Sequence, residues 1–185
     1  YGSNHNAREI PLAAMHCKRL GIPHIVINLD FMHRHFESSL LQGADAIPEG
    51  HYAADNMQST VVPFRNGIML AIAIGVAESH GLTQVFIANH GGDHTLYPDC
   101  TPQFIRAIDA AATAGTYVKA HVVAPYTNIS KADIARIGKQ LGLNYAETWS
   151  CYKGGAHHCG KCGTCIERKE ALQAAGIDDP TQYDA

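Results

Sequence analysis

The sequence predicts an α/β fold in which helices cover both faces of a parallel β-sheet, followed by a small cysteine-rich lobe. Short, unbroken apolar runs at residues 23–29, 84–88 and 120–124 are typical of strands buried on both faces. Segments of helical length separate these runs, as the crossovers between parallel strands require. We therefore place an α/β domain at residues 1–145 and the lobe, with a C-terminal helix, at residues 146–185.

Five segments have the capping residues, the apolar periodicity or the final glycine that delimit a helix. Asn6 and Glu9 form an N-cap signal before the first segment, and Thr101 with Pro102 forms another. Residues 43–60 are instead rich in Gly, Pro, Asp, Asn and Ser, and they predict a long loop, which at this length is either a functional lid or a disordered segment. The expected helices span residues 6–20, 63–80, 102–114, 131–141 and 166–175, and glycines at positions 21, 81, 142 and 176 follow four of them.

The composition limits the class of protein. Of the 185 residues, 46% are hydrophobic and 17% are charged, which is typical of a folded globular protein rather than a disordered one. The net charge of −3 disfavours a protein that holds duplex nucleic acid by bulk positive charge. We find no apolar run of the ~18 residues that a membrane span needs and no signal peptide, so we expect a cytoplasmic protein.

Four of the six cysteines lie close together near the C-terminus. Their C-x7-C-x2-C-x2-C spacing brings four soft, anionic ligands within reach of one ion. This donor set favours Zn²⁺ in a closed tetrahedral site with a structural role, and disulfides or an iron–sulfur cluster are the alternatives. We expect the neighbouring His157 and His158 to be exposed to solvent. The four expected ligands are Cys151, Cys159, Cys162 and Cys165.

Two of the expected helix starts carry side chains that suit a nucleotide. Arg65 and Asn66 lie near the start of the second helix, and Lys131 lies at the start of the fourth. A helix N-terminus attracts anions, arginine can donate two hydrogen bonds to a phosphate, and lysine adds a point charge. The same residues also fit plain helix caps with exposed side chains, and the residues alone leave both interpretations open.

The loop at residues 89–100 follows an expected strand and is rich in groups that form hydrogen bonds. Ligands bind beyond the carboxyl ends of parallel strands, so this loop suits the recognition of a flat, polar heterocycle. A capped turn with solvated histidines is the alternative interpretation. The loop contains two imidazoles, two carboxylates and a phenol, from His90, His94, Asp93, Asp99 and Tyr97.

Together these motifs resemble the 7-cyano-7-deazaguanine synthase (QueC) family, a member of the PP-loop ATP pyrophosphatase superfamily. The resemblance spans nearly the whole chain, and its last two stretches are the most specific, because few other families join them. The matching stretches are YGSNHNARE at residues 1–9, STVVPFRN at 59–66, DHTLYPDC at 93–100 and TWSCYKGG at 148–155.

The resemblance implies a Rossmann-like nucleotide-binding domain of the adenine nucleotide alpha hydrolase type. It implies ATP-dependent conversion of 7-carboxy-7-deazaguanine and ammonia to 7-cyano-7-deazaguanine, a precursor of queuosine in tRNA, through adenylated intermediates. ATP with Mg²⁺ and a structural zinc ion are the implied cofactors. The implied protein is a homodimer that binds small molecules, and neither nucleic acid nor a membrane.

The matching positions also imply roles for individual residues. Asp93 is expected to be catalytic. The expected ATP-binding residues are Arg65, Asn66 and Lys131. The expected substrate-binding residues are His90, Tyr97 and Asp99.

One motif of the family does not occur in these residues. The SGGxDS loop that cradles the pyrophosphate of ATP is expected upstream of Tyr1, together with a first strand. The alternative functions are another PP-loop enzyme, such as a tRNA thiolase or an amide-forming relative, and a non-enzymatic zinc-ribbon module that binds RNA or protein. The basic side chains near the cysteines that such a module could use are Lys153, Lys161, Arg168 and Lys169.

Overall fold

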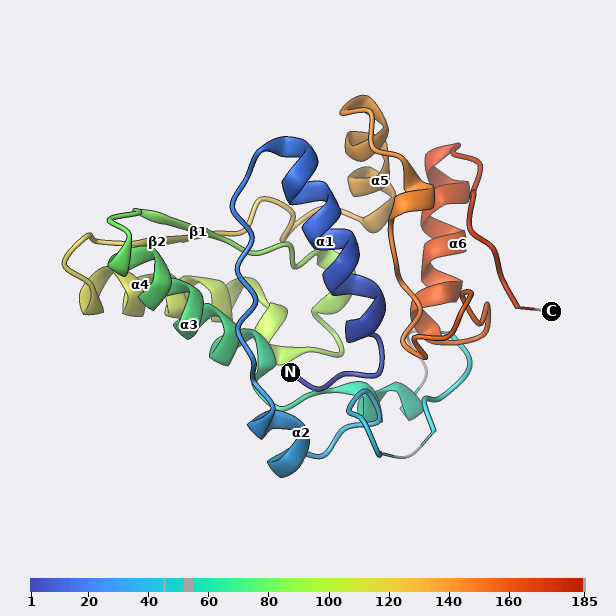
Figure 1. The fold of residues 1–185 in the computed structure, drawn as a ribbon, viewed down its shortest axis with the longest axis horizontal. Helices are drawn as coiled ribbons and strands as arrows, with labels where there is room; N and C mark the ends of the chain where they lie inside the picture. The colour runs from blue at the N-terminus through green and yellow to red at the C-terminus, as the bar shows by residue number, and fades with distance from the viewer. Residues whose placement is uncertain (45, 52–54, 185) are drawn as a thin grey trace. The chain divides into compact units, whose positions relative to one another are not determined.

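The computed structural model divides the chain into two compact units (Figure 1). We call residues 64–134 the central unit, and residues 1–63 with residues 135–185 the terminal unit. The predicted domain boundary at residue 145 divides the chain differently, and it stays a prediction. The structure describes residues 1–44, 46–51 and 55–184.

The central unit contains the parallel sheet. Strand β1, Gln84–Phe86, pairs in parallel with strand β2, His121–Val123, and Val85 lies opposite Val122. This pairing confirms the predicted α/β class and the parallel direction of the strands. Each strand occupies three residues within its longer apolar run.

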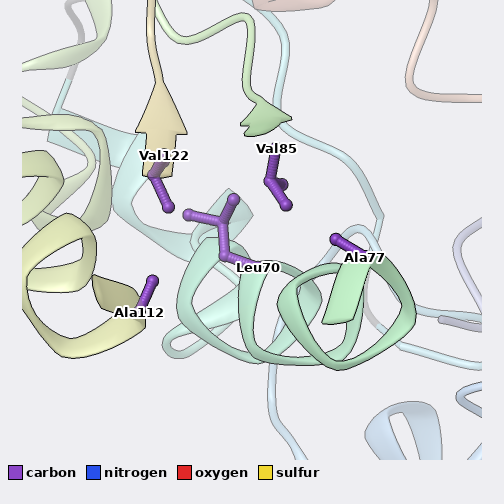
Figure 2. Close-up of a cluster of buried hydrophobic side chains, with 5 residues drawn as sticks. All are labelled: Leu70, Ala77, Val85, Ala112 and Val122. Carbon is purple, nitrogen blue, oxygen red and sulfur yellow. The ribbon is translucent and has the colours of Figure 1, made fainter. Parts of the chain in front are cut away.

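Two helices pack on the same face of this sheet. They are α3, Arg65–Ser79, and α4, Pro102–Gly115, and both contribute to one buried cluster (Figure 2). Phe86 on the opposite face is 64% exposed, so these two helices supply the helix layer of one face only. The buried cluster consists of Leu70, Ala77, Val85, Ala112 and Val122.

Capping hydrogen bonds explain where two helices begin. Thr101 Oγ1 accepts a hydrogen bond from Phe104 N at 3.2 Å, which confirms the predicted start of α4. Helix α5, Lys131–Gln140, begins after Ser130, whose Oγ accepts from Asp133 N at 3.1 Å and donates to Asp133 Oδ2 at 2.6 Å. These reciprocal contacts satisfy a backbone donor that the helix itself leaves unpaired.

The terminal unit is built from helices and irregular segments. The α-helices that begin in it are α1 (Asn6–Leu20), α2 (Phe31–His35) and α6 (Gly163–Ala175). Gly21 and Gly176 end α1 and α6 as predicted, because both adopt the left-handed conformation, with φ of 66° and 68°. The N-cap prediction is wrong for Asn6, which is already helical and accepts a hydrogen bond from Ser3 Oγ at 2.6 Å.

The strand predicted at residues 23–29 is not formed. Residues 22–29 have no regular secondary structure, and Ile25 and Val26 are 61% and 60% exposed. Apolar, β-branched residues favour an extended backbone, but a strand also needs a neighbour that pairs with its N–H and C=O groups. No such partner pairs with this segment in the described part of the chain, so the prediction is wrong.

The predicted loop at residues 43–60 contains regular structure at its end. Residues 45 and 52–54 of this loop lie outside the described residues. The 3₁₀-helix η1, Asp55–Thr60, is held by a hydrogen bond from Thr60 Oγ1 to Met57 O at 2.6 Å, and both residues are buried. Neither η1 nor the five-residue helix α2 has a sequence signal strong enough for prediction.

Among the described residues, one stretch passes the length and hydropathy test for a membrane span, and it is Asn56–Ser79. This stretch contains Arg65 and Asn66, so it is not an unbroken apolar run of the kind the expectation concerned. The structure breaks this stretch into η1, a turn and α3, and α3 buries Leu70 and Ala77 against the sheet. Core helices pass the same test, so this finding is weak support for a membrane span.

The residue before α3 has an uncommon backbone conformation. Phe64 has a φ of 51°, in the left-handed region where a bulky side chain is strained. Its ring packs on Phe104 with the ring centroids 5.8 Å apart, and it also covers Gly67. A Cβ atom at Gly67 would lie 2.3 Å from the Phe64 ring, so the ring can stay in place only above a glycine.

We predict that Gly67→Ala displaces the Phe64 ring and destabilises the central unit. Gly75→Ala on the same helix is the matched control, because its new methyl group meets no atom within 4 Å. The control should stabilise the protein by up to about 1 kcal/mol through helix propensity. Urea denaturation should give Gly67→Ala a free energy of unfolding about 1–3 kcal/mol below that of the control. Equal values would contradict the ring-packing argument.

Candidate functional site

The four cysteines of the predicted metal site come together in the terminal unit. Their Sγ atoms all lie within 4.8 Å of one another, and all four residues are buried. Cys151 lies in an irregular segment, whereas Cys165 lies in the first turn of α6. The convergence that the spacing predicts is confirmed, and the cluster can hold a metal ion.

The distances within the cluster fit a metal site and exclude disulfides. All six cysteines are free, and the Sγ atoms of Cys159 and Cys165 are 4.0 Å apart. A disulfide bond is about 2.05 Å long. Four sulfurs bound to one tetrahedral Zn²⁺ at about 2.3 Å would lie roughly 3.8 Å from one another. The donor set and its spacing therefore fit zinc, and the disulfide alternative is wrong.

Backbone N–H groups contact two of the sulfur atoms in this cluster, and a helix start lies beside a third. Cys159 N donates to Cys151 Sγ, and Cys162 N donates to Cys159 Sγ, both at 3.3 Å. Hydrogen bonds from Cys151 and Cys165 hold the pKa of the Cys162 thiol well below its usual value, and the pKa of Cys165 is raised in turn. Helix α6 begins at Gly163, earlier than predicted, and its positive end stabilises the adjacent thiolate.

A histidine and a tryptophan pack beside the cysteines. His158 is only 5% exposed, so the prediction of a solvated side chain is wrong, whereas His157 is exposed as predicted. The His158 ring packs on Trp149 with the ring centroids 4.1 Å apart, and its Nε2 accepts a hydrogen bond from Ser150 N at 3.1 Å. Burial lowers the pKa of His158 to about 4. The imidazole is therefore neutral and supports the lobe as a packing residue.

A buried arginine, whose structural role sequence reasoning missed, ties α6 to the segments before and after it in the chain. Arg168 is 7% exposed, and its Nε donates to Thr181 Oγ1 at 2.7 Å and lies 3.4 Å from Asp179 Oδ1. Its other nitrogens donate to Thr148 Oγ1 and Tyr145 O, both at 2.8 Å. Sequence reasoning counted Arg168 among the basic side chains available to RNA, and this interpretation is wrong. Only a side chain with several planar donors can join so many segments.

We predict that Cys162→Ser releases the metal and destabilises the lobe, because metal binding is coupled to folding. Elemental analysis should find one zinc ion per wild-type chain and less than a tenth of that in the variant. The free energy of unfolding should fall by more than about 3 kcal/mol. Cys17→Ser, on the half-buried part of α1, is the control and should keep its metal. Full zinc content in Cys162→Ser would contradict the site.

We predict that replacing the buried Arg168 lowers the free energy of unfolding even when the metal is bound. Arg168→Leu leaves the Asp179 carboxylate and several oxygens without their partner, so we expect a loss of about 3–5 kcal/mol in thermal or urea unfolding. Arg106→Leu, at an exposed position on α4, is the matched control and should change stability by less than about 0.5 kcal/mol. A similar small change in both variants would show that Arg168 does not hold the lobe together.

In the central unit, the loops that follow β1 and β2 meet. Gly91 N donates to Ile129 O at 3.0 Å, and Asn89 Nδ2 donates to Thr127 Oγ1 at 3.2 Å. Asn89 Nδ2 also donates to Cys100 O at 2.7 Å, which closes the loop at residues 89–100 on itself. Parallel strands place these loops at one edge of the sheet, as predicted.

Two predicted site residues of this loop contact each other. His90 Nε2 lies 3.4 Å from Asp93 Oδ1, and His90 Nδ1 accepts a hydrogen bond from Gly92 N at 3.1 Å. The proton of a neutral His90 is therefore on Nε2, where it faces the Asp93 carboxylate. His90 and Tyr97 are 5% and 6% exposed, so the alternative of a solvated His90 is wrong.

Two further predicted residues, Asn66 and Asp99, meet at the start of α3. Asp99 Oδ2 accepts a hydrogen bond from Asn66 N at 2.8 Å, and Asn66 Nδ2 donates to Asp99 O at 3.3 Å. The carboxylate of Asp99 thus fills the anion position at this helix start. Lys131 is half-buried at the first position of α5, just beyond Ile129.

Cys100 belongs to the same cluster, and sequence reasoning missed it. Its Sγ accepts a hydrogen bond from Asn66 Nδ2 at 3.1 Å. Burial, with the nearby charges of Asp93 and Asp99, raises the pKa of this thiol to about 12, and the charge of Arg65 acts in the opposite direction. The thiol is therefore neutral, and its hydrogen bond from Asn66 joins the end of the loop to the start of α3.

The chain matches one family model and many similar proteins. The model described as "Queuosine biosynthesis protein QueC" matches residues 1–176. A 7-cyano-7-deazaguanine synthase of Porphyromonas gingivalis is 60% identical over 184 residues, which are 100% of this chain and 84% of the relative. Synthases of the same name from Desulfotalea psychrophila and Rhizobium meliloti are each 49% identical, over 99% and 100% of this chain and 84% and 78% of the relatives. The chain therefore belongs to the QueC family.

Proposed function

We propose that this chain is an ATP-dependent C–N ligase that converts 7-carboxy-7-deazaguanine and ammonia to 7-cyano-7-deazaguanine for queuosine biosynthesis. The observation that carries the proposal is the family match over residues 1–176, together with the name that the similar proteins share. The cluster around His90 and Asp93 lies within this match and offers the polar groups that such chemistry needs.

The chemistry has a clear physical order. A carboxylate is a poor electrophile, so transfer of AMP from ATP to its oxygen first makes that oxygen part of a phosphate leaving group. Ammonia displaces AMP and leaves an amide. A second activation of the amide oxygen and its loss as AMP, with two protons removed from nitrogen, give the nitrile. Negative charge develops on phosphate oxygens at each activation, and basic side chains and the Mg²⁺ that accompanies ATP offset it.

The proposed roles follow from the contacts in the central unit. Asp93, poised against the His90 ring at 3.4 Å, is the proposed catalytic residue that exchanges protons at the reacting nitrogen. Arg65, Asn66 and Lys131 are the proposed ATP-binding residues. Arg65 and Lys131 supply positive charge for the phosphates, and Asn66 fixes the start of α3 next to Arg65 through its hydrogen bond to Asp99. The proposed substrate-binding residues are His90, Tyr97 and Asp99.

The remaining features of the proposal concern the whole protein. We propose that the four-cysteine site holds Zn²⁺ with a structural role, because four thiolates leave no position for water or substrate. A cytoplasmic homodimer that binds small molecules and no nucleic acid is the expected form. The alternative of an RNA-binding zinc ribbon has little support, because Arg168 is buried and Lys153 pairs with Glu49 at 2.6 Å.

We predict that Asp93→Asn lowers nitrile formation at least about 100-fold and leaves the melting curve unchanged. Mass spectrometry of the reaction with 7-carboxy-7-deazaguanine, ammonia and ATP measures the product directly. Asp178→Asn, at an exposed position after α6, is the matched control. Unchanged turnover in Asp93→Asn would remove Asp93 from the site. An amide as the final product of the wild-type protein, or a thiolated tRNA, would favour the alternative PP-loop enzymes.

A further inference from the structure

A short extended segment of the terminal unit lies against the cysteine-rich lobe. We call residues 46–51 the strap, and they form neither a helix nor a strand ladder. An isolated antiparallel bridge pairs Glu49 with Cys162, which is one of the four predicted metal ligands. Next to this bridge, Gly50 N donates a hydrogen bond to Lys161 O at 3.0 Å. The strap is therefore joined to the turn that carries metal ligands, although the two are far apart in sequence.

An apolar side chain of the strap also contacts the metal site. Ile47 is half-buried and packs against the cluster of four cysteines, which are at most 8% exposed. The surface that Ile47 contacts exists only while the four sulfur atoms stay together. Thiolates at these distances repel one another unless a cation lies among them, so this apolar contact depends on the metal.

Two side-chain contacts at the surface fix the position of the strap along the lobe. Lys153 Nζ donates to Glu49 Oε1 at 2.6 Å. His51 Nε2 lies 3.4 Å from Glu170 Oε2 on α6. Exposed pairs of this kind stabilise a protein only weakly. The backbone bridge and the Ile47 contact are therefore the main attachment of the strap.

The strap contributes to the wall of an open cavity of about 650 Å³ in the terminal unit. Ala46, at the start of the strap, lines this cavity, and the other walls come from α2, from the segment that follows α2, and from η1. Asn56 Nδ2 in η1 donates to Glu49 O at 3.3 Å, so the strap and η1 are also joined. Movement of the strap would therefore change the shape of this cavity.

We propose that metal binding by the four cysteines fixes the strap, and that loss of the metal releases residues 46–51 and opens one wall of the cavity. The bridge from Glu49 to Cys162 and the packing of Ile47 both involve the metal-binding residues, so both weaken when those residues separate. Segments with few buried apolar contacts open at a low free-energy cost, and the strap is such a segment. The metal site thus has a role beyond the lobe itself, and this role does not depend on the proposed reaction.

Hydrogen–deuterium exchange of the zinc-loaded protein, measured by mass spectrometry, tests this proposal. Ile47→Ala removes the apolar contact and should speed exchange in the strap, including the Gly50 amide, at least about tenfold. Its zinc content and the exchange in α6 should stay as in the wild type. Ile137→Ala, at a half-buried position on α5, is the matched control and should leave exchange in the strap unchanged.

A second variant tests the ion pair at the edge of the strap. Glu49→Gln breaks the pair with Lys153 and should speed exchange in the strap by only about two- to threefold, because exposed ion pairs are weak. Glu147→Gln is the matched control, since it breaks the pair between Arg19 and Glu147, which has the same N–O distance of 2.6 Å. Exchange in the strap should be unchanged in this control.

Removal of the metal with a chelator tests the coupling directly, and exchange in the strap should rise at least about tenfold. Equal exchange in the strap with and without zinc overturns the proposal. If the chelator also loosens α6, the zinc-loaded Ile47→Ala variant decides, because wild-type exchange in its strap overturns the proposal and faster exchange supports it. None of these measurements involves catalysis, so a protein that forms no nitrile overturns the proposed function and leaves the role of the strap intact.

Discussion

Four sulfur atoms within 4.8 Å of one another are the strongest constraint in the terminal unit. As thiolates they repel one another, and the attraction of each thiolate to a cation at their centre would outweigh this repulsion. The described part of this unit has isolated bridges, such as Glu49 with Cys162, in place of a strand ladder. The cysteine cluster and the apolar side chains around it, among them Trp149 and Tyr183, therefore serve as a local core. Arg168 extends that core by joining α6 to its neighbours through hydrogen bonds.

In the central unit, the direction of the strands determines where the polar side chains of the two loops lie. Parallel pairing of β1 and β2 brings the loops after both strands to one edge, and hydrogen bonds from Asn89 and Gly91 join those loops. The neutral thiol of Cys100 and the carboxylate of Asp99 then connect this edge to the start of α3. Charge in this cluster is offset only in part, since the single positive charge of Arg65 opposes two carboxylates.

The sequence alone determined those features of this protein that depend on residues close together in the chain. The spacing of Cys151, Cys159, Cys162 and Cys165, the cap at Thr101 and the glycine after α1 act over a few residues, and the structure confirms each of them. The burial of Arg168 and His158, the place of Cys100 and the unpaired run at residues 22–29 depend on segments distant in the chain. An apolar run becomes a strand only when another strand pairs with it, and a charged side chain becomes buried only when distant oxygens surround it. Only the tertiary structure decides such features, because the partners that stabilise them are far apart in sequence.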